Sequence, residues 1–268
     1  MKYINEIAEL LKNKYLIETQ KIEKSEDSTD GNVYFAHSES DKFIVKIYKN
    51  LTHAKSMIDL HSCLVKESFN VPSIITSKSV KFATLPDKSV AVVYSFLQGE
   101  QIGWKLGSKD LNDSTIKTLA NTLYKMHFAT CGANKFNLPK LPFEASKTAR
   151  NSALHFDLTK GNIFVNGNKI GLIDFDDAKY GDSVCDVAIA VSNLFFSKTR
   201  GVDTDSTKLL IDEYYRNDPA AKKLELPLIK EYALRWIDYL LDNNDFDTSN
   251  KESFQVRRKL IESHDFGH

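Results

Sequence analysis

The sequence lacks the features that mark several large classes of protein. Its 36 basic and 36 acidic residues cancel to a net charge of zero, whereas proteins that bind nucleic-acid backbones usually carry a basic excess. It has no apolar run as long as the roughly 18 residues that a membrane helix needs. Internal repeats and low-complexity tracts are absent as well. We therefore expect neither a nucleic-acid partner nor a membrane partner.

Cysteine is scarce and scattered. Cys63, Cys131 and Cys185 are odd in number, far apart and without the spacing of metal ligands. They predict reduced thiols rather than a disulfide framework or a metal site. Residues 1–6 do not resemble the apolar part of a secretory signal. Together these absences predict a cytoplasmic protein.

The apolar fraction, 42% of 268 residues, is ample for one large domain or two small lobes. Two stretches in the second half, 154–165 and 170–178, carry most of the information. Asn162 follows Asp157 by five positions, and Asp174 follows Asn162 by twelve. Strand-like residues flank an Asn-Gly turn between the two stretches, which predicts a β-hairpin. The hairpin would bring Asn162 close to Asp174, with Asp157 nearby, and this set suits a divalent cation and a proton acceptor.

These stretches resemble the catalytic loop and metal-binding strand of the aminoglycoside phosphotransferase and choline kinase superfamily, which contains small-molecule kinases with a protein-kinase-like fold. The family's loop has the form His-Gly-Asp, with Asn five positions after the Asp, and its strand has the form Ile-Asp-Phe. Phe156 departs from the small residue that is usual after the His. The residues that carry the resemblance are His155, Asp157, Asn162, Ile173, Asp174 and Phe175.

The resemblance implies an α+β, bilobal fold. Residues 1–97 would form a small lobe with an antiparallel, nucleotide-binding sheet, and residues 98–268 a mostly helical lobe with the catalytic loop and the substrate site. The implied cofactors are ATP and Mg²⁺, with ATP in the cleft between the lobes. Asp157 would accept the proton of the acceptor hydroxyl, and Asn162 and Asp174 would hold Mg²⁺.

Lys46 lies in the middle of an apolar strand, residues 43–48, where burial of an unpaired ammonium would be costly. An edge strand or a solvent-facing position would explain it structurally. The resemblance instead implies the lysine that holds the α- and β-phosphates. Relatives pair this lysine with a Glu on the next helix, expected here at residues 53–69. The middle turns of that helix contain no Glu, and Asp59 is the nearest carboxylate.

Two further nucleotide contacts are implied in the first lobe. The polar turn at residues 25–32, which contains Gly31, would place backbone amides over the phosphates, although such a turn can equally be a plain hairpin connection. The apolar strand at residues 90–94 would lead into a lobe connection that pairs with adenine through the Ser95 carbonyl and the Leu97 amide. The alternative is an ordinary exit from a strand.

Two polar residues beside apolar helices predict structural roles. His127 ends the apolar stripe of a helix that begins near residue 112, and a single His in that position is seldom catalytic. Asp186 precedes the apolar run 187–191 and is expected to cap or brace that helix.

The acceptor is expected to be a small molecule with a hydroxyl group. The path from Asp174 to the next helix is short and has no Ala-Pro-Glu triplet, so a peptide-docking segment is not expected. The acidic stretch 238–247 could line a site for a cationic acceptor such as an aminoglycoside or choline, or could be a solvated helix end. Trp236 or Tyr239 could line the acceptor pocket, or could belong to the core.

Other functions stay open at this point. The acceptor could be a neutral or amino-acid metabolite, such as homoserine or a sugar. A nucleotide-binding pseudokinase or scaffold is the competing class, favoured only by the missing helix Glu. The sequence makes no prediction of the oligomeric state.

Overall fold

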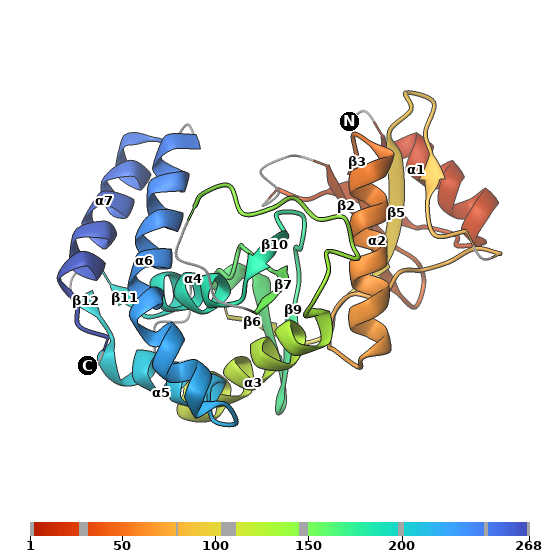
Figure 1. Ribbon diagram of the computed structural model, residues 1–268. Coiled ribbons are helices and arrows are strands. Elements are labelled where there is room, and N and C mark those ends of the chain that lie inside the picture. The colour runs from red at the N-terminus through yellow and green to blue at the C-terminus, as the bar shows by residue number, and fades with distance from the viewer. Residues whose placement is uncertain are drawn as a thin grey trace. The chain divides into compact units, whose positions relative to one another are not determined.

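The computed structural model describes residues 3–26, 32–78, 80–102, 111–144, 150–197, 201–243 and 246–266. The chain divides into two compact units, Met1–Gln98 and Gly99–His268 (Figure 1). Gly31 lies outside the described residues. No helix among the described residues is both long enough and apolar enough to cross a membrane.

The first unit is built on a five-stranded antiparallel sheet with the strand order β1-β2-β3-β5-β4. Helix α1 is extended by a π-helical turn, Leu11–Tyr15, and helix α2 lies beside β3 and β5 (Figure 1). The elements are α1 (Ile4–Leu10), β1 (Lys21–Lys24), β2 (Val33–His37), β3 (Lys42–Tyr48), α2 (Leu51–Lys66), β4 (Ala83–Thr84) and β5 (Val90–Ser95).

Strand alternation decides which residues of β3 enter the core of this unit. Val45 and Ile47 pack with α1 in one apolar cluster. Lys46 lies between them, so it projects from the opposite face of the sheet. Helix α2 covers that face, because the rings of Tyr48 and Tyr94 contact two of its histidines, at 5.3 and 5.0 Å. Lys46 is therefore half-buried on a central strand, and the edge-strand interpretation is wrong.

The second unit is mainly helical and carries three small sheets, with the orders β6-β8-β9, β10-β7 and β11-β12. Its strands are β6 (Glu100–Gln101), β7 (Asn151–Leu154), β8 (Ile163–Asn166), β9 (Lys169–Leu172), β10 (Lys179–Asp182), β11 (Phe196–Ser197) and β12 (Gly201–Val202). Its helices are α3 (Asp113–Thr130), α4 (Val184–Leu194), α5 (Thr204–Tyr214), α6 (Pro219–Asn243) and α7 (Thr248–Ser263), with a 3-10 turn at Lys160–Asn162.

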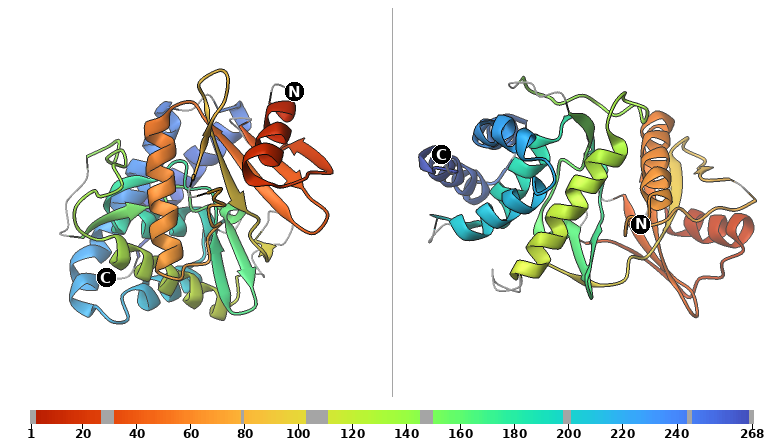
Figure 2. Two further views of the ribbon diagram at one scale, coloured as in Figure 1. Left: turned by 90° about the vertical axis from the view of Figure 1, so that its right-hand side faces the viewer. Right: turned by 60° about the horizontal axis from the view of Figure 1, so that its bottom comes forward.

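Local sequence explains where several of these helices begin. The side chains of Asn112, Asp203 and Asp247 accept hydrogen bonds from backbone amides three residues later, as good N-caps do. Helix α4 is apolar on nearly all sides and is buried, with α6 packed along it. In the views of Figure 2, α6 and α7 lie side by side at the C-terminal end of this unit, in agreement with their contacts.

The predicted fold class is confirmed, since an antiparallel-sheet unit precedes a mostly helical unit. The predicted hairpin at residues 163–172 is also confirmed, with Ile163 opposite Leu172. Between α2 and β5 the described chain forms the two-residue β4 and isolated bridges at Ile74 and at Ser77–Val80.

Candidate active site

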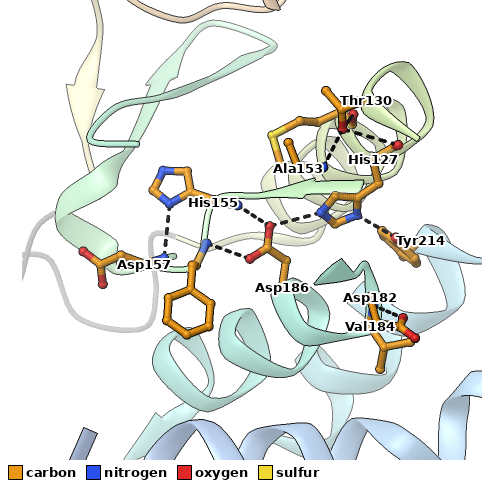
Figure 3. A network of polar contacts seen from close by, with 11 residues as sticks. His127, Thr130, Ala153, His155, Asp157, Asp182, Val184, Asp186 and Tyr214 are labelled. Carbon is orange, nitrogen blue, oxygen red and sulfur yellow. Dashed lines mark hydrogen bonds and ion pairs between the residues drawn. The ribbon is translucent and has the colours of Figure 1, made fainter. Parts of the chain in front are cut away.

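A buried carboxylate of the second unit holds the predicted catalytic loop in place. Asp186, in the first turn of α4, is fully buried. It accepts hydrogen bonds from the backbone amides of His155 and Phe156 at 2.7 and 2.9 Å (Figure 3). Each bond has an ionised acceptor and is therefore stronger than a neutral one. Asp186 thus braces the loop that carries Asp157, beyond the helix-bracing role predicted for it.

The ring of His155 holds the backbone of Asp157 in place. Its Nδ1 accepts from the Asp157 amide at 3.3 Å, and its Nε2 lies 2.8 Å from the carbonyl oxygen of Ile173. The ring also packs on Phe175 with the centroids 4.4 Å apart. Since a carbonyl only accepts, Nε2 donates to it, while Nδ1 accepts from the Asp157 amide. His155 therefore ties the Asp157 backbone to the strand end that precedes Asp174.

The hairpin brings Asn162 beside the residue before Asp174, as its sequence predicts. The Ile173 amide donates to the Asn162 carbonyl at 3.0 Å. The side-chain amide of Asn162 donates to the Asp157 carbonyl at 2.9 Å and to the Asp157 carboxylate at 2.8 Å. Donation through Nδ2 leaves Oδ1 as the acceptor atom of this side chain. The structure thus joins Asp157 to Asn162 directly, and Asn162 to the Asp174 strand through the backbone.

The charge environment of Asp157 is dominated by burial and by other carboxylates. The pKa of Asp157 is raised, mainly by burial. Repulsion from Asp177 and Asp174 raises it further, whereas His155 and the hydrogen bond from Asn162 lower it. The repulsion shows that three carboxylates lie close enough to interact. A divalent cation would relieve it. The donor set, an amide oxygen and carboxylate oxygens, is the set that Mg²⁺ prefers.

These residues fit a cation that is held partly by its substrate. Among the described residues, no group of three or more His, Cys, Asp and Glu side chains could hold a metal ion without other ligands. Mg²⁺ in phosphoryl-transfer sites is commonly bound by one or two protein ligands together with phosphate oxygens and water. Asn162 and Asp174 agree with that pattern.

Two residues of the site have backbone conformations that side chains disfavour. Phe156 has φ +66° and Asp174 has φ +64°. A positive φ costs about 1–2 kcal/mol for most L-residues, and Gly avoids this cost. The sequence does not reveal this strain. The positive φ explains why the family that the loop resembles usually has a small residue at this position.

Packing holds Phe156 in that conformation. Its ring is only 4% exposed. It contacts Tyr239 of α6, with the centroids 5.9 Å apart, and Phe143, at 6.4 Å. The Lys179 ammonium lies 5.2 Å from the ring centroid. Tyr239, predicted as a lining or core residue, is therefore in contact with the residue before Asp157, whereas the largely buried Trp236 packs on Phe254.

A second layer supports Asp186. The Nε2 atom of the buried His127 lies 3.1 Å from the Asp186 carboxylate, and its Nδ1 lies 2.7 Å from the hydroxyl of Tyr214 (Figure 3). A carboxylate only accepts, so Nε2 donates to it. His127 is structural, as predicted, and its place between Tyr214 and Asp186 could not be read from the sequence.

The predicted nucleotide-binding residues belong to the first unit. Lys46 is half-buried on β3, Ser95 ends β5, and the side chain of Leu97 is buried. Asp59 is exposed on the face of α2 that points away from the sheet, and no ion pair joins it to Lys46. The choice of Asp59 as the partner of Lys46 is therefore not supported. The call on Gly31 lies outside the described residues.

The acidic stretch after Trp236 offers less free charge than its composition indicates. Asp238 forms an ion pair with Arg258 at 2.6 Å. Asp247 caps α7 by accepting from the Asn250 amide at 2.7 Å. Two of the carboxylates that could line a site for a cationic acceptor therefore have structural roles instead.

Comparison with known proteins identifies the part of the chain that carries this site. Residues 135–216 match the model of a family described as the phosphotransferase enzyme family. The matched segment contains Asp157, Asn162, Asp174 and Asp186. No curated protein matches the chain. The predicted resemblance and the predicted enzyme class, a phosphotransferase, are thus confirmed.

Solved structures show the same fold over nearly the whole chain. Amicoumacin kinase hAmiN in complex with AMP-PNP, Ca²⁺ and Ami has a TM-score of 0.75 at 16% identity, with 98% of this chain and 96% of that chain covered. The microcompartment-associated aminopropanol kinase gives 0.71 at 14% identity, covering 96% and 95%. Spectinomycin phosphotransferase in complex with ADP and spectinomycin gives 0.63 at 16% identity, covering 96% of each chain. At this identity the likeness establishes the fold.

Proposed function

We propose that the protein transfers the γ-phosphate of ATP to a hydroxyl of a small molecule, because residues 135–216 match the model of the phosphotransferase enzyme family. The observation that carries the proposal is the contact of Asp157 with Asn162 at the end of the hairpin that leads to Asp174. The nucleotides named in the related structures, AMP-PNP and ADP, support the choice of ATP. A reaction of this kind would draw on cytoplasmic ATP.

Asp157 accepts the proton of the acceptor hydroxyl in this proposal. Its carboxylate is oriented by Asn162, while its backbone is held by His155. Phosphoryl transfer requires little covalent chemistry from a protein, so most of the acceleration comes from positioning and from charge neutralisation. A rigid loop with one correctly oriented carboxylate meets the first requirement.

Asn162 and Asp174 would hold Mg²⁺, which would neutralise charge on the phosphates of the nucleotide. In the first unit, Lys46 would bind the α- and β-phosphates. We further propose that the turn containing Gly31 contacts the phosphates, and that the Ser95 carbonyl and the Leu97 amide pair with adenine. The half-buried position of Lys46 on a central strand supports its part in this set.

A nucleotide-binding scaffold is the alternative of another class. The observation in its favour is that the middle turns of the helix after Lys46 contain no Glu. Against it, the second unit assembles Asp157 and Asn162 in direct contact, an arrangement that a scaffold does not need. For an enzyme, the acceptor is either cationic, as an aminoglycoside or choline is, or a neutral or amino-acid metabolite.

The test measures conversion of ATP to ADP and phosphate transfer to a panel of aminoglycosides, choline, sugars and hydroxy amino acids. We expect Mg²⁺-dependent transfer to at least one compound, and loss of turnover on chelation. Asp157→Ala should lower kcat by about 10²–10⁴-fold, the usual contribution of a general base, and keep nucleotide binding. Asp174→Ala should weaken Mg²⁺-dependent nucleotide binding as well.

Asp177→Asn is the matched control. Asp177 is an exposed carboxylate that affects the pKa of Asp157 but has no role in the proposed reaction. Its removal should change kcat far less than Asp157→Ala does. Full turnover in the Asp157 variant, or failure of every compound in the panel, would count against the proposed function.

A further inference from the structure

The basic residue Arg257 of α7 lies in an environment unlike that of its neighbour Arg258. Its guanidinium carbon is 5.0 Å from the ring centroid of Phe196 and 4.9 Å from that of Phe254. One nitrogen, Nη1, donates to the Asn193 side-chain oxygen at 2.6 Å. Arginine stacks well between aromatic rings because its planar cation is weakly hydrated. The rings hold the guanidinium in one orientation without neutralising it.

No carboxylate among the described residues forms an ion pair with Arg257, and its buried Nε has no hydrogen-bond partner. Burial lowers the pKa of Arg257 to about 10, because the loss of hydration is not offset by an anion. The adjacent Arg258, by contrast, pairs with Asp238 at 2.6 Å and with Glu262 at 3.2 Å. A buried charge without a partner is costly, and such charges are normally paired or used to bind a ligand.

Asn193 connects this cation to the catalytic loop. Its Nδ2 donates to the carbonyl of Leu158 at 3.2 Å, and its Oδ1 accepts from Arg257. Leu158 directly follows Asp157, so two hydrogen bonds separate the guanidinium from the residue beside the proposed base. Both bonds lie within the second unit.

We propose that Arg257 is a specificity-determining residue that binds an anionic oxygen group, a carboxylate or a phosphate, on the acceptor molecule. This inference rests on the proposed phosphotransferase function and narrows it, because it favours a hydroxy acid or a phosphorylated alcohol over an aminoglycoside or choline. The guanidinium matches the geometry of both anionic groups. The structural use of Asp238 and Asp247 agrees with it, since a cationic acceptor would need those carboxylates free.

The test compares acceptors that differ only in the anionic group. L-homoserine is compared with its amide, and glycerol 1-phosphate with glycerol, in wild-type protein with MgATP; choline and kanamycin represent cationic acceptors. We expect kcat/KM to be higher for the anionic member of at least one pair. Arg257→Met should remove about a hundredfold of that preference, the usual effect of truncating one partner of a buried charge pair. The two pairs also distinguish a carboxylate from a phosphate.

Two variants separate charge from packing. Arg257→Lys keeps the charge and should recover part of the preference. Arg258→Met removes the neighbouring, paired arginine and should leave the preference unchanged. The thermal midpoint of Arg257→Met should not fall, because Met stacks on the same rings and an unpaired charge is removed. A purely structural Arg257 would instead give a lower midpoint and an equal loss for both members of each pair.

The outcomes distinguish the inference from the function on which it rests. Asp157-dependent transfer to choline, kanamycin or glycerol, with no gain from an anionic group, would overturn the inference and keep the function. Equal effects of Arg257→Met on both members of each pair would also overturn it. Failure of every compound, together with no effect of Asp157→Ala on ATP turnover, would overturn both.

Discussion

Replacement of Phe156 by Gly and by Ala should reverse the usual order of stability. At ordinary positions Gly is less stable than Ala by about 0.5–1 kcal/mol, because it loses more backbone entropy on folding. Phe156 has φ +66°, a conformation that costs an L-residue about 1–2 kcal/mol and costs Gly little. We therefore expect Phe156→Gly to be more stable than Phe156→Ala by about 1 kcal/mol.

Both variants should be less stable than the wild type. The Phe156 ring is 4% exposed and packs on Tyr239 and Phe143. Removal of a buried Phe side chain costs about 3–5 kcal/mol. The Ala variant should lose about this amount, and the Gly variant about 2–4 kcal/mol, because relief of the strained backbone offsets part of the lost packing.

The measurement is urea unfolding of both variants, with the free energy extrapolated to water. Lys125 provides the matched control, since it is exposed in the middle of α3. There Lys125→Gly should be less stable than Lys125→Ala by about 1 kcal/mol. A Phe156 pair with the same order as the Lys125 pair would refute the argument that backbone strain is relieved at position 156.

Two further substitutions test the supports of the site. Asp186→Asn keeps the shape of the side chain, but its NH₂ group cannot accept a hydrogen bond, so one of the two backbone amides of the loop loses its acceptor. We expect a loss of about 3–5 kcal/mol in unfolding free energy and a lower kcat, measured by urea unfolding and steady-state kinetics. Glu225 is buried and accepts two hydrogen bonds from Arg150, at 2.8 and 2.7 Å. Glu225→Gln should cost about 2–3 kcal/mol, below the full penalty for a broken buried pair because Arg150 is partly exposed, and an unchanged thermal midpoint would contradict this.

The hairpin of the second unit was predictable because its signals are local. An Asn-Gly turn between two apolar runs determines the register, and the register places Asn162 beside the strand that ends before Asp174. The mid-strand position of Lys46 was equally predictable. The face of the sheet from which Lys46 projects was not predictable, because it depends on which sides of the sheet α1 and α2 cover.

The supports of the proposed catalytic loop depend on contacts between distant parts of the chain. Asp186 is 31 residues from His155, and His127 is 59 residues from Asp186. Each residue alone is typical of a helix in a core, so no local pattern reveals that they act on one loop. The strain at Phe156 is hidden for a related reason. The sequence shows only an apolar residue in a loop, and the backbone φ shows that the position favours Gly.

Charge near the C-terminus also depends on contacts that the sequence does not show. Arg257 and Arg258 are adjacent in the sequence, and the carboxylates after Trp236 form one acidic stretch. Helical geometry turns neighbouring side chains about 100° apart, so the two arginines meet different surroundings. Arg258 reaches Asp238, whereas Arg257 turns toward Phe196 and Asn193. The charge that matters for an acceptor is therefore the charge left unpaired after folding. Arg257 carries such a charge, two hydrogen bonds from Leu158, although the composition of residues 238–247 is acidic.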